Sequence, residues 1–392
     1  MIFFLFIIKM KKLILIYIFL TFISCQQLSF QTTMLSYLFN NPSQNICISP
    51  LSIYQVVSLI SNGATGKTQN EILKALIPDS NINSKTQFKL NQNNNRIINL
   101  YGSNNKHVKI ANAVMTKRNL LSSFLKYCKK YDAFVEPLKS TEQVNKWCSE
   151  KTNGKINKII DNINNVEMIL LNAVYFKSDW ANKFKFKNTK MRDFTNSNNE
   201  IVKVKTMYQE FNSINYYEDE KLQMIELPYE DNQLSMIIIL PNKKNYNSIY
   251  NFLNNEKKND YTKLLKRLKK TSKVKLYLPK FKFEYKSSLK EVFKKMGMEK
   301  AFSDNAEFTQ LNEGPKLKID EIIHKTFISV DEEGTEAAAV TAIINVRTSS
   351  RPKKTINMIV DHSFAFMIKD NRVRDTNGNN LMLFYGVVNN LK

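Results

Sequence analysis

The spacing of apolar residues predicts helices in the first half of the chain. Residues 50–60 are largely apolar and follow Ser49-Pro50, where Ser49 can cap a helix and Pro50 suits its first position. A second helix is predicted over residues 141–160, with a break near Gly154. One face of this helix carries three apolar side chains, Val144, Trp147 and Cys148.

Strand patterns dominate the second half. Residues 168–176 and 233–241 are nearly continuous apolar runs, which is typical of strands buried on both faces. Residues 274–283 alternate between apolar and polar. Two last strands are predicted over residues 364–368 and 381–388, with a hairpin turn at Asn377-Gly378. Helices followed by strands and hairpins predict an α+β fold.

One segment, from Glu332 to Thr341, mixes two structural preferences. Its Ala and Glu content favours helix, but it leads into the β-branched run 343–346. Gly334 provides a flexible joint, and the residues at period two after it are small and uncharged. Such a segment can lie outside as a loop and then enter a sheet as a strand without burying a charge. We term it the hinge segment; it comprises Glu332, Glu333, Gly334, Thr335, Glu336, Ala337, Ala338, Ala339, Val340 and Thr341.

Composition changes this picture little. The chain has 392 residues, 43% of them hydrophobic, and no Pro/Gly/Ser-rich linker, so one large domain over residues 26–392 is expected. The net charge of +23 is open to two interpretations. It indicates either an anionic partner, such as nucleic acid, a membrane surface or a sulfated polysaccharide, or compositional drift toward Lys and Asn.

The N-terminus predicts export. Met10-Lys11-Lys12 precedes an apolar run over residues 13–23, as in a secretory signal, and cleavage is expected near Ser24, Cys25 or Gln26. We therefore assign residues 1–25 to a signal peptide and expect a secreted, extracellular protein, with an uncleaved anchor as the alternative. The remaining cysteines, Cys47, Cys128 and Cys148, are odd in number and are expected to be buried rather than disulfide-bonded.

Enzymatic motifs are missing from the sequence. The run 63–68 resembles a phosphate-binding loop, but Ser61 occupies the position of the required first glycine, and the run follows a helix rather than a strand. There is no Gly-x-Ser-x-Gly or His-Glu-x-x-His motif, and the chain has only three histidines. We expect neither catalysis nor a metal or other cofactor.

Several short blocks together indicate a family. They are residues 45–53 and 63–68, 147–160, 171–180, 226–229, 278–281, 323–325, the hinge segment, and 364–368. In content, order and spacing these blocks resemble the serpins, serine-protease inhibitors that trap a protease by inserting their own cleaved loop into a central sheet. The resemblance implies a large central mixed sheet with further sheets, surrounding helices, and an exposed reactive loop at about residues 332–352.

The resemblance also implies roles for individual residues. Ser49, Ser52, Asn172 and His324 are expected to form a polar cluster behind the central sheet, where two strands must part, together with Trp180 and Lys280. Without the motif around it, His324 would be interpreted as an ordinary core histidine. Lys280 and Glu332 match a family pair that joins the top of the sheet to the hinge segment.

A secreted suicide inhibitor of a serine protease is the function that this resemblance implies, with a monomer expected. The alternative is a non-inhibitory serpin, such as a carrier, storage protein or chaperone. The inward positions of the hinge segment carry neither charge nor proline, which favours inhibition.

The reactive bond is assigned in two ways. Family loop length places it at Thr348-Ser349, whereas chemistry favours Arg347-Thr348, because a trypsin-like pocket prefers arginine. Pro352 disfavours cleavage after Arg351. We expect a trypsin-like target, with an elastase-like protease second.

Basic residues cluster around position 267. A helix is predicted over residues 261–270, with three leucines, Leu264, Leu265 and Leu268, on one side. It resembles the heparin-binding helix of protein C inhibitor. The alternatives are a site for a sulfated polysaccharide and a solvated face in a lysine-rich chain; no specific nucleic acid is expected. The candidate binding residues are Lys263, Lys266, Arg267, Lys269, Lys270 and Lys273.

Overall fold

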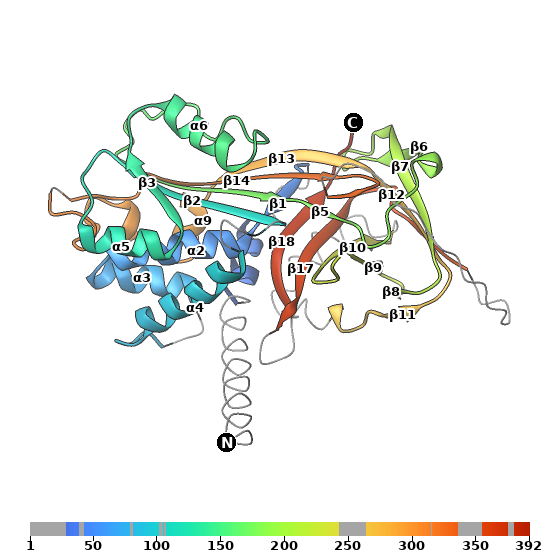
Figure 1. The fold of residues 1–392 in the computed structure, drawn as a ribbon, viewed down its shortest axis with the longest axis horizontal. Helices are drawn as coiled ribbons and strands as arrows, with labels where there is room; N and C mark the ends of the chain where they lie inside the picture. The colour runs from blue at the N-terminus through green and yellow to red at the C-terminus, as the bar shows by residue number, and fades with distance from the viewer. Residues whose placement is uncertain are drawn as a thin grey trace, which may run out of the picture.

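The computed structural model places helices at one end of the molecule and strands along its whole length (Figure 1). It describes residues 29–38, 43–78, 81–101, 105, 107–242, 264–314, 316–335, 355–374 and 380–392. The predicted signal peptide, the predicted hairpin turn at Asn377-Gly378 and most of the predicted reactive loop lie outside these ranges.

The central sheet is mixed, as expected. Its order is β3 (Ala133–Pro137), β2 (Val108–Thr116), β4 (Met168–Phe176), β14 (Glu321–Val330), and β13 (Phe281–Ser288) pairs with β14 on the far side. β4 and β14 run parallel, while β2 and β4 run antiparallel. At one end, past the stretch where β4 pairs with β14, two short strands take over: β14 pairs with β15 (Gly334–Thr335), and β15 pairs with β5 (Ser178–Asp179).

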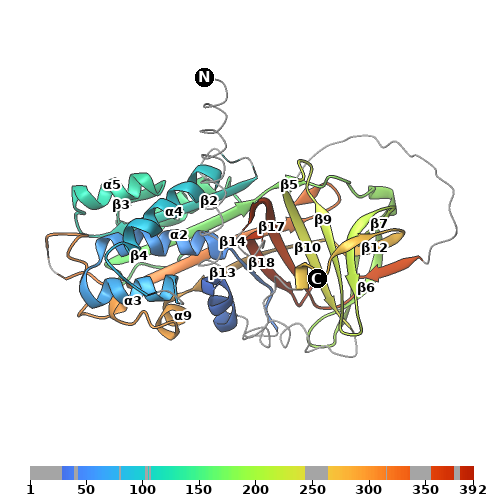
Figure 2. The same cartoon turned by 90° about the horizontal axis from the view of Figure 1, so that it is seen from below.

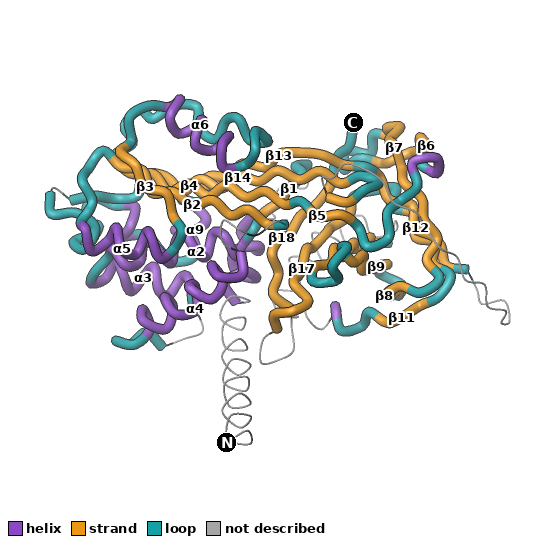
Figure 3. The backbone as a smooth tube through the Cα atoms, in the orientation of Figure 1, coloured by secondary structure: helices purple, strands orange, loops and turns teal. Residues whose placement is uncertain are grey.

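Two further sheets occupy the strand-rich end (Figure 3). The second sheet is antiparallel in the order β1 (Ile46–Ile48), β18 (Asn380–Val388), β17 (Phe364–Arg374), β10 (Leu234–Pro241), β9 (Leu222–Pro228), β8 (Ile214–Glu218) and β11 (Lys269–Thr271). The third sheet has the order β16 (Ile356–Ile359), β12 (Val274–Pro279), β7 (Ile201–Phe211) and β6 (Lys190–Thr195).

Helices cover both faces of the central sheet. α6 (Thr141–Lys151) lies on one face, and most of the others lie on the opposite face (Figures 1 and 2). Those others include α2 (Pro50–Ile60), α3 (Gly66–Leu76), α4 (Thr86–Tyr101), α5 (Ser122–Lys130) and α9 (Lys290–Lys295). Because both faces are covered, every residue of β4 is buried, which explains its uninterrupted apolar sequence.

Most of the predicted elements are confirmed, and the bounds of three of them are corrected. The helix over 50–60 and the strands over 168–176, 364–368 and 381–388 are present, but the Ser49 side chain makes no capping bond. The second helix ends at Lys151 rather than residue 160, because Asn153 and Gly154 adopt left-handed backbone angles of φ 53° and 73°. Residues 274–283 form two strands in different sheets, separated at Lys280.

The third correction concerns the basic segment. Among its described residues the helix covers only Leu264 and Leu265, and the chain then turns into strand β11. The prediction of a helix to residue 270 was therefore wrong. The three leucines do pack against the core, so their side of the segment was predicted correctly.

The three described cysteines are buried in the core, as expected. Cys47, Cys128 and Cys148 are free and buried, and burial raises the pKa of each thiol to about 12. Cys148 belongs to a separate apolar cluster in which Val144 and Trp147 of α6 cover the central sheet. Within the described ranges, no helix is both long enough and apolar enough to span a bilayer.

Candidate functional site

The hinge segment begins inside the central sheet. β4 and β14 pair directly over residues 169–175 and 321–327, which leaves no room between them. Beyond this stretch Val330 pairs instead with Thr335, and Thr335 pairs with Ser178 of β5. The two residues of β15 thus already occupy the position of an added strand, at the end of a sheet in which β4 and β14 are otherwise paired directly.

Thr335 is fully buried in this seat. Its Oγ1 lies 2.8 Å from the hydroxyl oxygen of Tyr229, at the end of β9. The Tyr229 ring stacks on Trp180, with ring centroids 4.7 Å apart and planes at 9°. Trp180 in turn donates from Nε1 to the carbonyl of Asp331 at 3.0 Å. The hydroxyl of Thr335 is therefore bonded to a tyrosine whose ring is itself held by stacking on Trp180.

Close backbone contacts explain the glycine at position 334. A Cβ there would lie 2.2 Å from the carbonyl oxygen of Ser178, a distance that no side chain can tolerate. Two main-chain bonds hold the preceding residues, from Trp180 N–H to Glu333 at 2.8 Å and from Phe184 N–H to Glu332 at 2.9 Å. The sequence requires glycine here for proximity as well as for flexibility.

Ion pairs anchor the base of the hinge segment. Lys280 Nζ lies 2.5 Å from the carboxylate of Glu332, which also accepts a bond from Thr189 at 2.7 Å. Burial alone would raise the pKa of Glu332, but these two bonds outweigh it and lower the pKa below its usual value. Lys183 bridges Glu333 at 2.6 Å and Asp179 at 2.7 Å, and hydrogen bonds to Asp179 and Glu333 raise its pKa.

The polar cluster lies at the middle of the same sheet. His324 of β14 and Asn172 of β4 are directly paired across the two strands, and His324 Nδ1 lies 2.5 Å from Asn172 Oδ1. Ser52 of α2 donates to the same oxygen at 2.8 Å. Asn172 also donates to Asn112 of β2 at 2.6 Å, so the network crosses three strands.

The hydrogen bonds define the state of His324. Its Nε2 accepts from the main-chain N–H of Ser49 at 3.2 Å, so Nδ1 carries the proton and donates to Asn172. Burial lowers the pKa of His324 to about 3, because the charged ring would be fully desolvated. The cluster is therefore neutral, and its donors and acceptors are matched with one another.

The structure brings together the predicted residues in two groups. Ser49, Ser52, Asn172 and His324 form the cluster at the middle, whereas Trp180 and Lys280 lie at the hinge end, so the six do not make one site. Ser49 participates through its main chain rather than its hydroxyl. Some of the predicted site residues lie outside the described ranges: Glu336, Ala337, Ala338, Ala339, Val340, Thr341, Arg347, Thr348, Ser349 and Lys263.

Sequence reasoning missed several partners. Asn112 is a polar residue inside the apolar run 110–115, and that interruption was a usable signal of a buried polar network. Tyr229 lay in one of the matched blocks but was given no role. Thr189 and Lys183 carried no signal of their contacts with the hinge segment, because their glutamate partners there are more than 140 residues away in the sequence.

The basic residues of the 264–273 region form a surface group. Lys266, Arg267 and Lys269 line a pocket of about 480 Å³ together with Tyr217. The Arg267 guanidinium lies 5.6 Å from the centroid of the Tyr217 ring and 3.7 Å from the Asp219 carboxylate. Lys270 lies on β11, and Lys273 lies between β11 and β12. Within the described ranges, no group of three acidic, His or Cys side chains could hold a metal ion.

Comparisons with known proteins identify the family. The serpin (serine protease inhibitor) family profile matches residues 26–391. An uncharacterized serpin-like protein of Methanosarcina mazei is 34% identical over 360 residues, which are 88% of this chain and 81% of the relative. Leukocyte elastase inhibitor of Xenopus laevis is 33% identical over 369 residues, covering 88% and 93% of the two chains.

Solved structures agree with this assignment. Native tengpin, a thermophilic serpin, superposes with a TM-score of 0.80 at 30% identity, and the match covers 94% of each chain. A complex of thyroxine-binding globulin with thyroxine gives 0.80 at 25% identity, over 94% of this chain and 98% of the other. The expected architecture of a large central mixed sheet with further sheets and surrounding helices is confirmed, and the described residues form three sheets in all. The chain belongs to the serpins, a family of protease inhibitors rather than enzymes.

Proposed function

We propose that this serpin is a suicide inhibitor of a trypsin-like serine protease. The observation that carries the proposal is the seat of Thr335. An uncharged inward side chain already lies between β14 and β5, and the next inward residues, Ala337, Ala339 and Thr341, are small and uncharged. Nothing in their chemistry opposes further insertion.

The mechanism follows from the strand arrangement. A protease attacks a loop peptide bond and forms an acyl-enzyme. The freed loop then extends β15 as a strand between β4 and β14, which must separate. From Glu332 to Thr348 there are 17 residues, so full insertion would carry the protease roughly 50 Å at ~3.3 Å per residue. That displacement separates the protease from the position of attack before water completes hydrolysis.

The polar cluster fits this step. Separation of β4 from β14 breaks the bond between His324 and Asn172, and their freed groups are adjacent to the incoming strand. Polar groups can exchange one hydrogen-bond partner for another, so the groups freed there can bond to the main chain of the incoming strand and do not remain unsatisfied. The cluster therefore lowers the cost of opening in the middle of the paired stretch of β4 and β14.

The direct test is formation of covalent complexes. The purified protein is incubated with trypsin-like, elastase-like and chymotrypsin-like proteases, and complexes that survive SDS are sought. We expect them with a trypsin-like protease. Mass spectrometry of the released C-terminal peptide then identifies the bond: Thr348 at its start supports Arg347-Thr348, and Ser349 supports Thr348-Ser349. Loop cleavage by every protease, with no stable complex, would instead favour a non-inhibitory role, such as that of a carrier.

We further propose that sulfated polysaccharide binds at the basic residues near position 267. Support comes from Lys266, Arg267 and Lys269, which line one pocket. The test is elution from heparin-agarose of the wild type against a Lys266→Ala/Arg267→Ala/Lys269→Ala variant. A local site predicts elution of the variant at lower salt than a control that lacks three dispersed surface lysines, Lys139, Lys187 and Lys295. Equal elution of both variants would attribute binding to the total charge.

Secretion is also proposed, on the charged start and apolar run of residues 10–23. Expression of the full chain in a secreting cell tests it. N-terminal sequencing of protein from the medium should give a start near residue 25. Retention of the full-length chain in the membrane fraction would support the anchor instead.

A further inference from the structure

The turn between β9 and β10, residues 229–233, contacts the hinge segment and the central sheet at the same time. Tyr229 holds Thr335, and the N–H of Glu230 donates to the carbonyl of Asp179 in β5 at 2.9 Å. On its other side Asp231 reaches His107, just before β2, with 3.1 Å between the carboxylate oxygen and Nε2. One short turn thus joins the hinge seat, β5 and β2.

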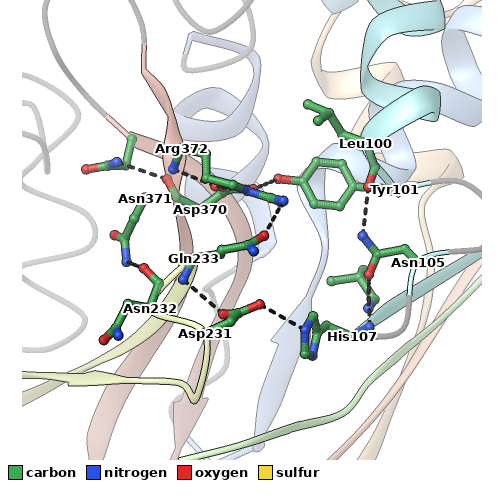
Figure 4. A network of polar contacts seen from close by, with 12 residues as sticks. Leu100, Tyr101, Asn105, His107, Asp231, Asn232, Gln233, Asp370, Asn371 and Arg372 are labelled. Carbon is green, nitrogen blue, oxygen red and sulfur yellow. Dashed lines mark hydrogen bonds and ion pairs between the residues drawn. The ribbon is translucent and has the colours of Figure 1, made fainter. Parts of the chain in front are cut away.

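A ring of polar contacts fixes this turn (Figure 4). Asp231 Oδ1 accepts from the N–H of Gln233 at 2.9 Å, and the Gln233 side chain accepts from Arg372 of β17. Arg372 pairs with the fully buried Asp370, which accepts from the hydroxyl of Tyr101 in α4. On the other side, Asn105 Oδ1 accepts from the N–H of His107 at 2.9 Å, and its amide donates to Leu100, beside Tyr101. Two contacts in this ring involve charge. The ion pair of Arg372 and Asp370 lies within β17, and the one other joins separate parts of the chain.

That one contact is between Asp231 and His107. The ring nitrogen lies close to the carboxylate but makes no directed hydrogen bond, so the attraction depends on the charge of the imidazole. Both side chains are mostly buried, with exposures of 11% for His107 and 20% for Asp231, so solvent screens the pair less than a surface pair. The remaining contacts in the ring hold the carboxylate in place whatever the charge of the histidine.

Among the residues that the structure describes, no other contact brings a charged side chain to the His107 ring. Lys177, in the link between β4 and β5, donates its main-chain N–H to the His107 carbonyl at 2.8 Å, while its side chain is exposed. Lys109 of β2 directs its ammonium to Asn153. Asp370 and Arg372 of β17 neutralise each other. Glu230 of the turn is exposed.

We propose that Asp231 is a positioning residue for loop insertion, and that it acts through a tether to His107 which tightens as pH falls. The inference rests on the proposed inhibitory function for its consequence, but not for the tether itself. β2, β4 and β5 lie on the side of the sheet that must move away from β14 when a strand enters. The turn holds that side at two points, Asp179 and His107, and holds Thr335 between them through Tyr229.

The direction of the pH effect follows from charge. A protonated imidazole is attracted by the carboxylate, whereas a neutral ring is not, and histidine changes charge between about pH 5 and 8. The tether is therefore tight under acidic conditions and loose under alkaline ones. A tight tether fixes the β2 and β5 side of the sheet, through Tyr229, to Thr335, which is paired with Val330 of β14. It therefore slows separation of β4 from β14, so acid should retard insertion.

Hydrogen exchange of the uncleaved protein tests the tether directly. The exchange rate of the segment 330–335 is measured by mass spectrometry near pH 5.5 and pH 8.5 for wild type, Asp231→Asn, His107→Gln and the double variant. Taking the ratio of variant to wild type at each pH removes the intrinsic chemistry of exchange. We expect either single variant to exchange roughly two- to fivefold faster near pH 5.5 and equally fast near pH 8.5, with no additional effect in the double variant.

A ratio of variant to wild-type exchange rate that is the same at both pH values would overturn the proposal. So would effects of Asp231→Asn and His107→Gln on the exchange rate that add in the double variant. The isosteric change Asp231→Asn keeps the acceptor for Gln233, so loss of folding is not expected. Asn232→Ser, in the same turn but without a contact to His107, serves as the pH-independent control.

Insertion is followed separately, by the fluorescence of Trp180 after loop cleavage in a Trp147→Phe background. A pH-dependent exchange ratio without any fluorescence change would support the tether and contradict the inhibitory function. If a fluorescence change occurs, its rate in each variant is divided by the wild-type rate at the same pH. A ratio that does not depend on pH would contradict the tether's role in insertion.

Discussion

The middle of the central sheet and its hinge end are held by opposite kinds of interaction. In the middle, His324, Asn172 and Ser52 are fully buried, uncharged and linked only by hydrogen bonds. At the hinge end, Glu332 and Glu333 pair with Lys280 and Lys183, which are partly exposed, beside a stack of aromatic rings. In the proposed mechanism, one region closes two strands that must part, and the other retains the base of a segment that must move.

The contrast has a physical basis. Neutral hydrogen bonds can be exchanged with an entering strand at small net cost, because each lost partner has a replacement. A carboxylate that loses its lysine finds no opposite charge on an uncharged entering strand, and at a partly exposed site only solvent screens it. Charged anchors therefore suit the base of the hinge segment, which stays in place, while a neutral cluster suits the line along which the sheet opens.

The largest effect is expected from Thr335→Arg. An arginine would require a charge in the seat where Thr335 is fully buried against Tyr229, at a cost of several kcal/mol. The loop should still be cleaved, but covalent complexes should disappear from SDS gels. Thr335→Ser keeps the hydroxyl and serves as the control. Complex formation by the arginine variant at the wild-type stoichiometry would refute insertion through this seat.

Acid should act on the middle of the sheet through His324. The folded state excludes a proton until the pH approaches the lowered pKa of about 3, whereas an unfolded histidine binds one near ~6.5. The unfolded state thus binds more protons in this window, and stability falls as pH decreases from about 6.5 to 3, by on the order of 4–5 kcal/mol. Urea midpoints at several pH values test this. A His324→Gln variant should show a flatter profile, and an unchanged profile would exclude His324 as the cause.

Removal of the shared acceptor should destabilise the middle of the sheet further. Asn172→Ala leaves His324, Ser52 and Asn112 without their common partner. We expect a loss of about 2–4 kcal/mol in the free energy of unfolding, measured by urea denaturation. The exposed Asn164→Ala is the matched control and should change stability by less than about 0.5 kcal/mol. An equally small effect at Asn172 would mean that the cluster does not hold the strands together.

The smallest effect is expected at the hinge end. Lys280→Ala leaves Glu332 with only Thr189, but the lysine is 31% exposed and solvent screens part of the pair. The expected destabilisation is about 1 kcal/mol, together with faster hydrogen exchange of the hinge segment. Lys187→Ala, an exposed neighbour, should have no effect. A loss as large as that of Asn172→Ala would reverse the comparison between the two regions.

The sequence predicted the elements that local patterns encode. The apolar run over β4 was located to the residue, and the start of the helix at Pro50 was predicted correctly, because apolar runs and the preference of proline for the first helical position act over a few positions. The matched blocks predicted the polar cluster and the pair of Lys280 with Glu332. The predictions were wrong where a sequence pattern continued past the residue at which the helix or strand ends. Lys280 interrupts the alternating run between β12 and β13, and the basic segment leaves its helix to pair with β8.

Sequence alone therefore determined the family, the helical and strand segments, and the small uncharged side chains that suit the hinge segment to insertion. Tertiary structure decided that β15 is already seated, that Tyr229 and Trp180 form the seat, and that His107 meets Asp231. The physical reason is range. Periodicity and propensity act between near neighbours in the chain. The contacts of Thr335 with Tyr229 and of His107 with Asp231 join residues more than 100 positions apart, through packing that no local pattern records.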